Sequence, residues 1–412
     1  MYKRVSGTKD IFFDEVYSWQ EIEKISHKIF SLYNYQEIRP PLIEDAGLFN
    51  RSLGEFTEIV CKQMFLIKNQ EDVYALRPEG TASIARAYIE NNLDKTKGFV
   101  KLYYIGPMFR LERPQKGRLR QFHHIGTEVI GSHQPEVDVE VISLADELLK
   151  AYSISGYKIK INTIGCSKDK QELIKILREE LKNKLGGLCA DCNERFKHNV
   201  LRILDCKNEA CQEVIEKIGL GHKHLCPGCL KHFSAVKQGL DALKIKYEVA
   251  LLLVRGLDYY TSTVFEIKHP CLGSQDAIGA GGRYDNLVKE LGGPDAGAMG
   301  FAFGVERLLL AKNQKPKTKS QNLVYVITLG EEAKKAGLKI LDELRKAGLP
   351  SDTDYENKSL KGAMRSANDA GAGFVLIIGE DELKKNTVML KNMQSGEQRE
   401  VAGKDLIKEL KC

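Results

Sequence analysis

The sequence predicts an α+β protein: a large, mostly antiparallel sheet with helices packed on it, a small inserted domain, and a C-terminal α/β domain. In the first part, helical and extended segments do not alternate regularly, which argues against a doubly wound parallel sheet. A cysteine-rich stretch then interrupts the composition before strand character returns. Finally, a polar, basic, proline-containing stretch precedes a more regular pattern, as is typical of a linker before a separate domain.

These breaks predict the domain boundaries. We expect one domain from residues 1–166 and 235–315, an insertion at 167–234, a linker at 313–321 and a last domain at 321–412. With 42% hydrophobic and 29% charged residues the chain resembles a soluble globular protein, and its net charge of +6 is too small to identify a polyanionic partner. An apolar run of membrane-spanning length and an apolar signal core are both lacking, so we expect a cytoplasmic protein without a membrane segment.

Periodicity places the elements along the chain. Apolar residues at helical spacing predict helices over 14–30 and 137–152. Extended patterns predict strands over 73–76, 100–105 and 122–130, with strand character again over 248–267. In the last domain we expect strands and helices in the order strand 323–329, helix 331–347, helix 360–370, strand 374–378, strand 386–391.

A basic loop between two strands is the richest polar segment. Five basic residues and one acid lie between Arg110 and Arg120, and Pro114 and Gly117 interrupt regular structure there. Guanidinium groups match phosphate oxygens in pairs, so the loop suits a phosphate-bearing ligand. A solvated basic hairpin is the alternative explanation.

The strand that follows this loop carries polar side chains on one face. Alternation puts Arg118, Phe122, His124 and Glu128 on the same side. Because buried charges need partners, this mixture indicates the floor of a polar cleft and not an apolar core.

Further clusters combine arginine or glycine with polar residues, at 76–81, 253–261, 279–285 and 297–310. Each alone is explained by a tight turn or a surface ion pair. The last places Arg307 in the first turn of a helix, where the helix N-terminus adds positive potential. The glycines at 279–285 lack the full spacing of a dinucleotide site. Together the clusters favour an anion-binding site.

These motifs resemble those of class II aminoacyl-tRNA synthetases. The basic loop is similar to motif 2, residues 300–307 to motif 3, and residues 38–44 to motif 1. The signatures Leu-Arg-Pro-Glu-Gly-Thr, Leu-Val-Arg-Gly-Leu-Asp-Tyr-Tyr and Gly-Gly-Arg-Tyr-Asp resemble those of histidyl-tRNA synthetases. The resemblance runs in family order from Gly7 to the C-terminus.

The resemblance implies a fold and a reaction. The fold would be a class II antiparallel catalytic sheet with an inserted domain and an anticodon-binding α/β domain. L-Histidine and ATP, with Mg²⁺, would give histidyl-adenylate and pyrophosphate, and histidine would then pass to the 3'-terminal adenosine of tRNA(His). A homodimer through motif 1 is implied as well, and Gln115, Lys116 and Arg118 are candidates to contact the tRNA acceptor end.

The resemblance also implies residue roles. Arg110 and Arg255 would be catalytic. ATP would be bound by Arg110, Glu112, Arg118, Phe122 and Arg307. Histidine would be bound by Glu79, Gly80, Thr81, Arg110, His124, Glu128, Arg255, Tyr259 and Tyr260. His124 stands where the family usually has glutamine.

Two functions from other classes compete with this interpretation. One is a regulatory paralogue of ATP phosphoribosyltransferase that binds histidine without activating it, and the other is a tRNA-binding module without catalysis. Such regulators typically lack the C-terminal domain and lose catalytic arginines, whereas Arg110, Arg255 and Arg307 are present here. A binding module would not need the pair Glu79 and Glu128.

Six of the ten cysteines fall between Cys189 and Cys229. The pairs Cys189/Cys192 and Cys226/Cys229 have the spacing of a tetrahedral zinc set, although 33 residues separate them. Cys206 and Cys211 form a third, looser pair. The alternative is that these are reduced thiols of a cytoplasmic protein.

Overall fold

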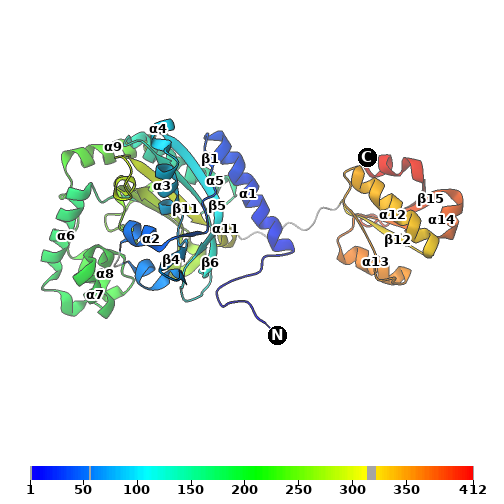
Figure 1. Cartoon of the computed structure of the whole chain (residues 1–412), viewed down its shortest axis with the longest axis horizontal. Coiled ribbons are helices and arrows are strands. Elements are labelled where there is room, and N and C mark those ends of the chain that lie inside the picture. The colour runs from blue at the N-terminus through cyan, green and yellow to red at the C-terminus, as the bar shows by residue number, and fades with distance from the viewer. Residues whose placement is uncertain (1, 55–56, 313–321, 412) are drawn as a thin grey trace. The chain divides into compact units, whose positions relative to one another are not determined.

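The computed structural model describes residues 2–54, 57–312 and 322–411. Contacts divide the chain into two compact units between residues 315 and 316 (Figure 1). Each unit has its own hydrophobic clusters, which contain residues up to Ala311 in the first unit and from Leu323 onward in the second. The linker predicted at 313–321 lies outside the described residues.

The first unit is built on an eight-stranded sheet. All neighbouring strands are antiparallel except the outer pairs β1–β5 and β7–β8, which are parallel. The predicted antiparallel architecture is therefore confirmed. The strands lie in the order β1 (Gln36–Glu37), β5 (Val100–Phe109), β6 (Gln121–Ile130), β11 (Ala298–Gly304), β10 (Ala277–Arg283), β9 (Thr261–Lys268), β7 (Lys158–Thr163), β8 (Tyr247–Val249).

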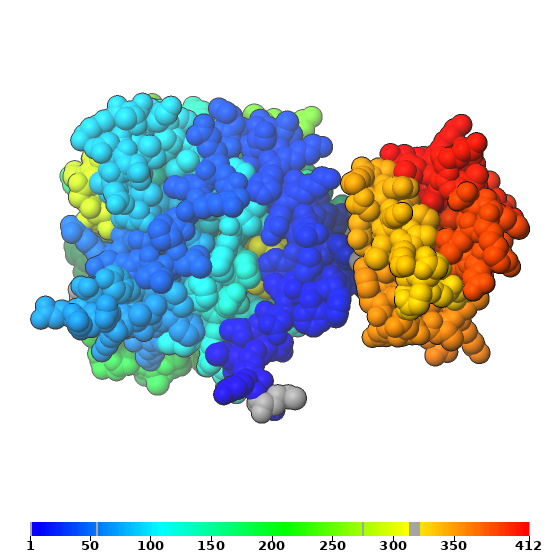
Figure 2. Space-filling view, turned by 45° about the vertical axis from the view of Figure 1, so that its right-hand side comes forward, coloured from blue at the N-terminus to red at the C-terminus, as the bar shows by residue number. Residues whose placement is uncertain are grey.

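Helices cover one face of this sheet. Ile125 of β6 and Phe265 of β9 point into the hydrophobic cluster that these helices share with the sheet. Because strand side chains alternate, Phe122 and His124 of β6 point to the opposite side, where the cavity lies. The helices are α1 (Asp14–Leu32), α5 (Pro135–Ala151), α9 (Pro227–Ala242) and α11 (Val305–Lys312). Figure 2 shows the dark blue N-terminal segment, which includes α1, on the outside of this unit.

A smaller layer lies on the cavity side. The side chain of Glu79 caps the N-terminus of α3, because it accepts hydrogen bonds from the backbone N–H groups of Thr81 and Ala82, at 2.7 and 2.8 Å. The elements are α2 (Ala46–Leu53), the π-helix η1 (Ile59–Gln63), α3 (Thr81–Glu90), α4 (Leu93–Thr96), α10 (Leu287–Glu290), and a three-stranded sheet of β2 (Ile43–Asp45), β4 (Asp72–Leu76) and β3 (Phe65–Asn69).

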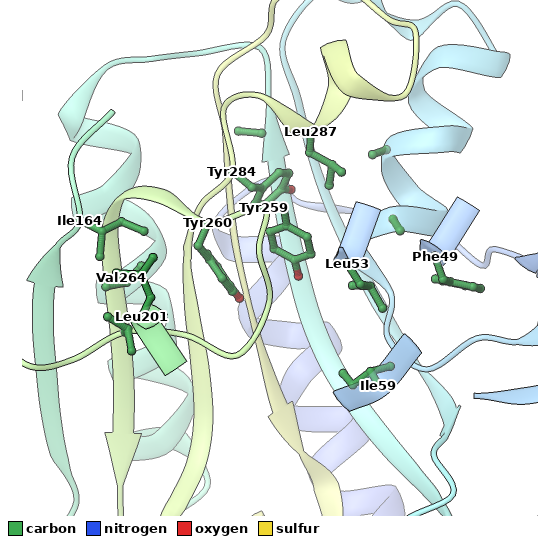
Figure 3. Close-up of a cluster of buried hydrophobic side chains, with 14 of the residues drawn as sticks. Phe49, Leu53, Ile59, Ile164, Leu201, Tyr259, Tyr260, Val264, Tyr284 and Leu287 are labelled. Atoms are coloured by element: carbon green, nitrogen blue, oxygen red, sulfur yellow. The ribbon is translucent and has the colours of Figure 1, made fainter. Parts of the chain in front are cut away.

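The cysteine-rich segment is helical and packs on the same side. Its hydrophobic residues join the cluster of the main sheet, so that Leu201 lies beside Val264 and Ile164 (Figure 3). Figure 1 shows α6, α7 and α8 together on the side of the unit away from α1. The elements are α6 (Ser167–Leu181), η2 (Leu185–Gly187), α7 (Ala190–His198), η3 (Val200–Asp205) and α8 (Glu209–Glu216), and the 3-10 helix η4 (Pro270–Gln275) follows β9.

The second unit is a five-stranded sheet between helices. Val324 and Val326 of β12 pack toward α12, and Tyr325 and Ile327 pack toward α13, so both faces are covered. The strand order is β13 (Ser351–Thr353), β12 (Val324–Thr328), β14 (Phe374–Ile378), β15 (Thr387–Asn392), β16 (Gln398–Ala402). The helices are α12 (Glu331–Lys346), α13 (Leu360–Asp369), α14 (Glu380–Lys385), η5 (Gly403–Asp405) and α15 (Leu406–Lys411).

In the part of the chain that the structure describes, none of the helices is both long enough and apolar enough to cross a membrane.

Candidate active site

A cavity of about 360 Å³ opens on the face of the main sheet opposite α1, α5, α9 and α11. Strands β6, β9, β10 and β11 form its floor, and the loops 110–120 and 254–260 form its walls. Three arginines from different parts of the chain, Arg110, Arg255 and Arg307, line this one cavity. The clustering of guanidinium groups that the sequence predicts is therefore present in a single site.

The residues predicted to bind ATP all line the cavity: Arg110, Glu112, Arg118, Phe122 and Arg307. Arg118 and Glu112 form a two-point ion pair, one contact of which, Nη2 to Oε1, is 2.9 Å long. Arg110 donates from Nε to the carbonyl of Pro78 at 2.9 Å. Its guanidinium carbon lies 5.3 Å from the centre of the Phe122 ring.

Arg307 is held at the start of α11 by backbone carbonyls. Its Nε donates to Gly117 at 2.9 Å and its Nη1 to Ala277 at 2.6 Å. Burial lowers the pKa of Arg307, and the charge of Arg118 lowers it further. Burial likewise lowers the pKa of Arg110. Because these cations lose hydration and repel one another, an anion entering the cavity would be stabilised.

Arg255 occupies the opposite wall with an acidic partner that sequence reasoning missed. Its Nη1 donates to Glu266 Oε1 of β9 at 2.8 Å, while its Nε is buried without a hydrogen-bond partner in the described chain. Burial works against the charge of Arg255, but the facing Glu266 carboxylate raises its pKa. The available signal was alternation, because the charged residues Glu266 and Lys268 alternate along β9 with the apolar, buried residues Phe265 and Ile267.

The predicted histidine-binding residues Glu79, Thr81, His124, Tyr259 and Tyr260 also line the cavity. The rings of Tyr259 and Tyr260 have centres 4.7 Å apart. Burial raises the pKa of Glu79, and the N–H groups of α3 and the charge of Arg110 partly offset this. Burial and several arginines, Arg110 first, hold the pKa of His124 well below its ordinary value. His124 is therefore a neutral ring, and its Nδ1 is buried with no partner among the described residues.

Glu128 and Gly80, also predicted to bind histidine, do not line the cavity. Glu128 is buried behind the residues that line the cavity. Its carboxylate accepts hydrogen bonds from the Thr81 hydroxyl at 2.7 Å and from the Tyr284 hydroxyl at 2.5 Å. Burial raises its pKa to about 8. Gly80 leaves room for the Tyr104 ring, which would lie 2.5 Å from a Cβ at this position.

Two tyrosines of the cavity were not singled out from the sequence. Tyr104 and Tyr284 both line it, and Tyr284 reaches from the cavity to the buried Glu128. Tyr284 belongs to the Gly-Gly-Arg-Tyr-Asp signature, which was the signal available. In that signature Arg283 is instead structural, because it is fully buried and paired with Asp138 and Asp285.

The cysteine pairs predicted to form one zinc set are divided between two groups. Cys189 and Cys192 lie with Cys206 and Cys211, and we call this group the distal cluster. Cys226 and Cys229 lie with Cys166 and Asp169, the basal cluster. In each group the ligand atoms all lie within 4.8 Å of one another. The predicted set of four cysteines was wrong, because the two CxxC pairs do not lie together. Each pair lies instead beside two ligand residues from another part of the chain.

Comparisons with known proteins identify the same family that the sequence motifs resemble. The family model described as "Histidyl-tRNA synthetase" matches residues 7–308, and that described as "Anticodon binding domain" matches residues 323–412. The histidine–tRNA ligase of Thermodesulfovibrio yellowstonii is 44% identical, over 98% of this chain and 97% of its own length. That of Natranaerobius thermophilus is also 44% identical, over 99% and 98%.

Solved structures agree with the sequence comparisons. The apo histidyl-tRNA synthetase of S. aureus superposes with a TM-score of 0.81 at 33% identity, covering 100% of both chains. A Bacillus halodurans chain described as an ATP phosphoribosyltransferase regulatory subunit/histidyl-tRNA synthetase has a TM-score of 0.68 at 21% identity, a likeness of fold. Because the first family model covers most of the chain and the ligases match nearly all of it, the chain belongs to the histidyl-tRNA synthetase family, the class II enzymes that use ATP to attach histidine to tRNA(His).

Proposed function

We propose that histidine is activated in the 360 Å³ cavity, with Arg110 and Arg255 on opposite sides of the reacting groups. The enzyme is a histidine–tRNA ligase, which forms histidyl-adenylate and pyrophosphate before it charges tRNA(His). The observation that carries the site assignment is that Arg110, Arg255 and Arg307 line one cavity together with Glu79.

The charge of these arginines fits the chemical step. The histidine carboxylate attacks the α-phosphate of ATP, so two anions must approach each other. Fixed guanidinium groups offset that repulsion, and they need no rearrangement at the moment of reaction. Arg255 is restrained by Glu266 and Arg110 by the carbonyl of Pro78, so both charges are held in place before the substrates bind.

We assign the outer part of the cavity to ATP. Arg307, fixed by two backbone carbonyls, would meet the outer phosphates, and Phe122 would stack on the adenine. Mg²⁺ accompanies ATP in this family and neutralises phosphate charge. The carboxylates Glu112 and Glu266 are already paired with arginines, so we expect the phosphates themselves to hold the ion.

We assign the inner part to histidine. Glu79 would accept from the substrate ammonium group, and Tyr259 and Tyr260 would contact the imidazole. Glu128 would act through Tyr284, whose hydroxyl bonds to it. A pocket that satisfies substrate hydrogen bonds in this way rejects analogues that lack them by about 10⁴-fold or more.

Histidine-dependent exchange of pyrophosphate into ATP tests the assignment. The intact chain should catalyse exchange, and Arg110→Ala and Arg255→Ala should each abolish most of it while the protein stays folded. Normal exchange in both variants would place the reaction elsewhere. A chain that binds histidine without any exchange would instead be a regulatory paralogue.

We also propose a homodimer. Leu42 and Ile43 belong to motif 1 and are 41% and 51% exposed. Ile67 of β3 is 40% exposed and lies on the same face of the three-stranded sheet as Ile43. Apolar side chains gathered in this way are typical of a protein interface. Sedimentation equilibrium should give twice the chain mass, and Ile67→Lys should shift the protein toward the monomer. A monomeric wild type at micromolar concentration would contradict this.

The remaining assignments follow from the domain plan. Residues 1–166 and 235–315 would form the catalytic domain, 167–234 the insertion and 321–412 the anticodon-binding domain. The loop residues Gln115, Lys116 and Arg118 would contact the acceptor end of tRNA(His). We place the enzyme in the cytoplasm, where charged tRNA is used, and propose that the insertion holds structural zinc.

A further inference from the structure

We propose that the insertion holds two zinc ions, one in the distal and one in the basal cluster, and that the distal ion fixes the segment that carries Arg255. The proposal rests on the assigned role of Arg255, but its metal content is measured independently of activity. Each cluster supplies four ligands, the number that a closed structural zinc site takes.

The distal cluster has the spacing of a tetrahedral thiolate site. Cys189 Sγ and Cys206 Sγ are 3.9 Å apart. Zinc–sulfur bonds of about 2.3 Å place the corners of a tetrahedron about 3.8 Å apart. A disulfide would need about 2.05 Å. The backbone N–H of Cys189 also donates to Cys211 Sγ at 3.1 Å, which stabilises negative charge on that sulfur.

The basal cluster contains a carboxylate oxygen that lacks a partner. Asp169 Oδ1 accepts from the backbone N–H of Cys226 at 3.1 Å, whereas its Oδ2 is buried with no partner in the described chain. An unpaired buried carboxylate oxygen is costly. It lies among the thiols of Cys166, Cys226 and Cys229, so a zinc ion would satisfy it. The backbone N–H of Cys166 donates to Cys229 Sγ at 3.2 Å.

Helix N-termini converge on both clusters. In the basal cluster, Cys166 and Cys226 are the N-cap residues of α6 and α9, and each helix supplies a second ligand, Asp169 or Cys229, from its first turn. In the distal cluster, Cys189 is the N-cap residue of α7. Helix N-termini favour thiolates over thiols, and the thiolate is the form that binds the metal. Mostly sulfur ligands in a tetrahedral set select zinc over magnesium or calcium.

The distal cluster is linked to the active site by the residues between its ligands. Arg202 Nη1 donates to the carbonyl of Gly256 at 3.0 Å, and Asn199 Nδ2 donates to Asp258 Oδ1 at 2.7 Å. Asp205, next to Cys206, lines the cavity with Arg255. Residues 250–260 contain no helix or strand, so these bonds restrain a segment that lacks regular structure of its own.

The basal cluster closes the insertion at its root. Cys166 follows β7, and Cys226 stands where the chain returns through α9, so one ion would join the two ends of a long loop. Lys170, next to Asp169, donates to the carbonyl of Asp258 at 2.6 Å and contacts that of Tyr260 at 3.3 Å. This cluster therefore supports the same segment from the other side.

Metal analysis of freshly purified protein tests the number of ions. Mass spectrometry should find about two zinc ions per chain. Cys211→Ser and Asp169→Asn should each leave about one and the double variant about none, whereas Cys271→Ser, outside both clusters, should keep two. Should a variant fail to fold, release of zinc from the wild type to a chromogenic chelator still counts the ions.

Three results would overturn the two-ion proposal. The first is a wild type without zinc, and the second is iron in its place. The third is a single ion that is lost in Cys189→Ser and Cys226→Ser but kept in Cys211→Ser and Asp169→Asn, because that would restore the ligand set predicted from the sequence.

Kinetics test the positioning role. Folded Cys211→Ser should show a kcat for pyrophosphate exchange about 10²-fold lower, since small misplacement of a catalytic group costs about this much. Its KM for ATP should change by less than about threefold, because Arg307 and Phe122 lie outside the restrained segment. Unchanged kcat would overturn the positioning role. A wild type that binds two zinc ions but lacks exchange would instead contradict the proposed function.

Discussion

Arg255 is the residue whose replacement separates binding from chemistry. Its charge is held by Glu266 and faces the cavity from the wall opposite Arg110. We expect Arg255→Ala to lower kcat for pyrophosphate exchange about 10²–10³-fold, as removal of a preorganised group that stabilises the transition state does. The KM for ATP should change little, as steady-state kinetics over a range of ATP will show.

Glu266→Gln is the matched control for this prediction. It keeps Arg255 but removes the charge that restrains it, so its kcat should lie between those of the wild type and Arg255→Ala. If Arg255→Ala changes only the KM values, the arginine contributes to ground-state binding and not to the transition state.

Glu128 makes stability depend on pH. Its folded-state pKa is about 8, raised from 4.5 by burial, so the folded chain retains a proton that the unfolded chain releases. The free energy of unfolding should therefore fall as pH rises from 4.5 to 8 and change no further above 8. The slope is at most about 1.4 kcal/mol per pH unit.

Glu128→Gln removes this dependence, because an amide does not titrate. The difference in unfolding free energy between wild type and variant should therefore shrink between pH 5 and 8. Trp19, the only tryptophan, is 7% exposed in the core of the first unit, so its fluorescence in urea reports this unit alone. Parallel pH curves for the two proteins would show that Glu128 is already ionised.

Strand β11 depends on small residues where it crosses the buried carboxylate. A Cβ at Gly300 would collide with the Glu128 side chain and the carbonyl of Thr127. We expect Gly300→Ala to lower the unfolding free energy of the first unit by about 1–3 kcal/mol, the usual cost of overpacking. The thermal midpoint, followed through Trp19, measures it.

Gly304, at the end of the same strand, provides the control. A Cβ there would meet only the Arg307 side chain, at 3.6 Å or more, so Gly304→Ala should leave the midpoint nearly unchanged. Equal effects of the two substitutions would mean that strand propensity, and not the contact with Glu128, sets the cost.

Local pattern predicted the elements well but not their partners. The alternation of β6 correctly placed Phe122 and His124 on the cavity side, because side-chain direction in a strand is a local property. Glu128 shares that face, yet it lies beneath Tyr284, a residue from a distant strand end. The cysteine pairs were likewise found by spacing, but their partner ligands depend on which helix ends meet in the fold.

The two units carry separate hydrophobic cores, so each is expected to fold without the other. A chain ended after Lys315 should therefore keep histidine-dependent pyrophosphate exchange. Its KM for tRNA(His) in aminoacylation should rise at least about tenfold, equivalent to about 1.4 kcal/mol of lost binding. Loss of exchange in a folded truncated chain would show that activation needs the second unit.

At the scale of the molecule, the motifs indicated the family because they occur in order along the whole chain. The role of the insertion could not be predicted in the same way. Its composition sets it apart, yet Leu173, Leu177 and Leu201 join the hydrophobic cluster of Val254 and Val264. Burial of this kind depends on contacts between segments far apart in sequence, which no periodicity records.

The support that Asn199, Arg202 and Lys170 give to residues 256–260 bears on how the enzyme loses activity. Proteins unfold locally in separate cooperative units. A segment without regular structure loses its conformation when the residues that hold it by hydrogen bonds unfold. Partial opening of the helices around α7 would free Arg255 while the eight-stranded sheet stayed intact. We therefore expect this peripheral region to set the upper temperature for charging tRNA, below the melting point of the sheet.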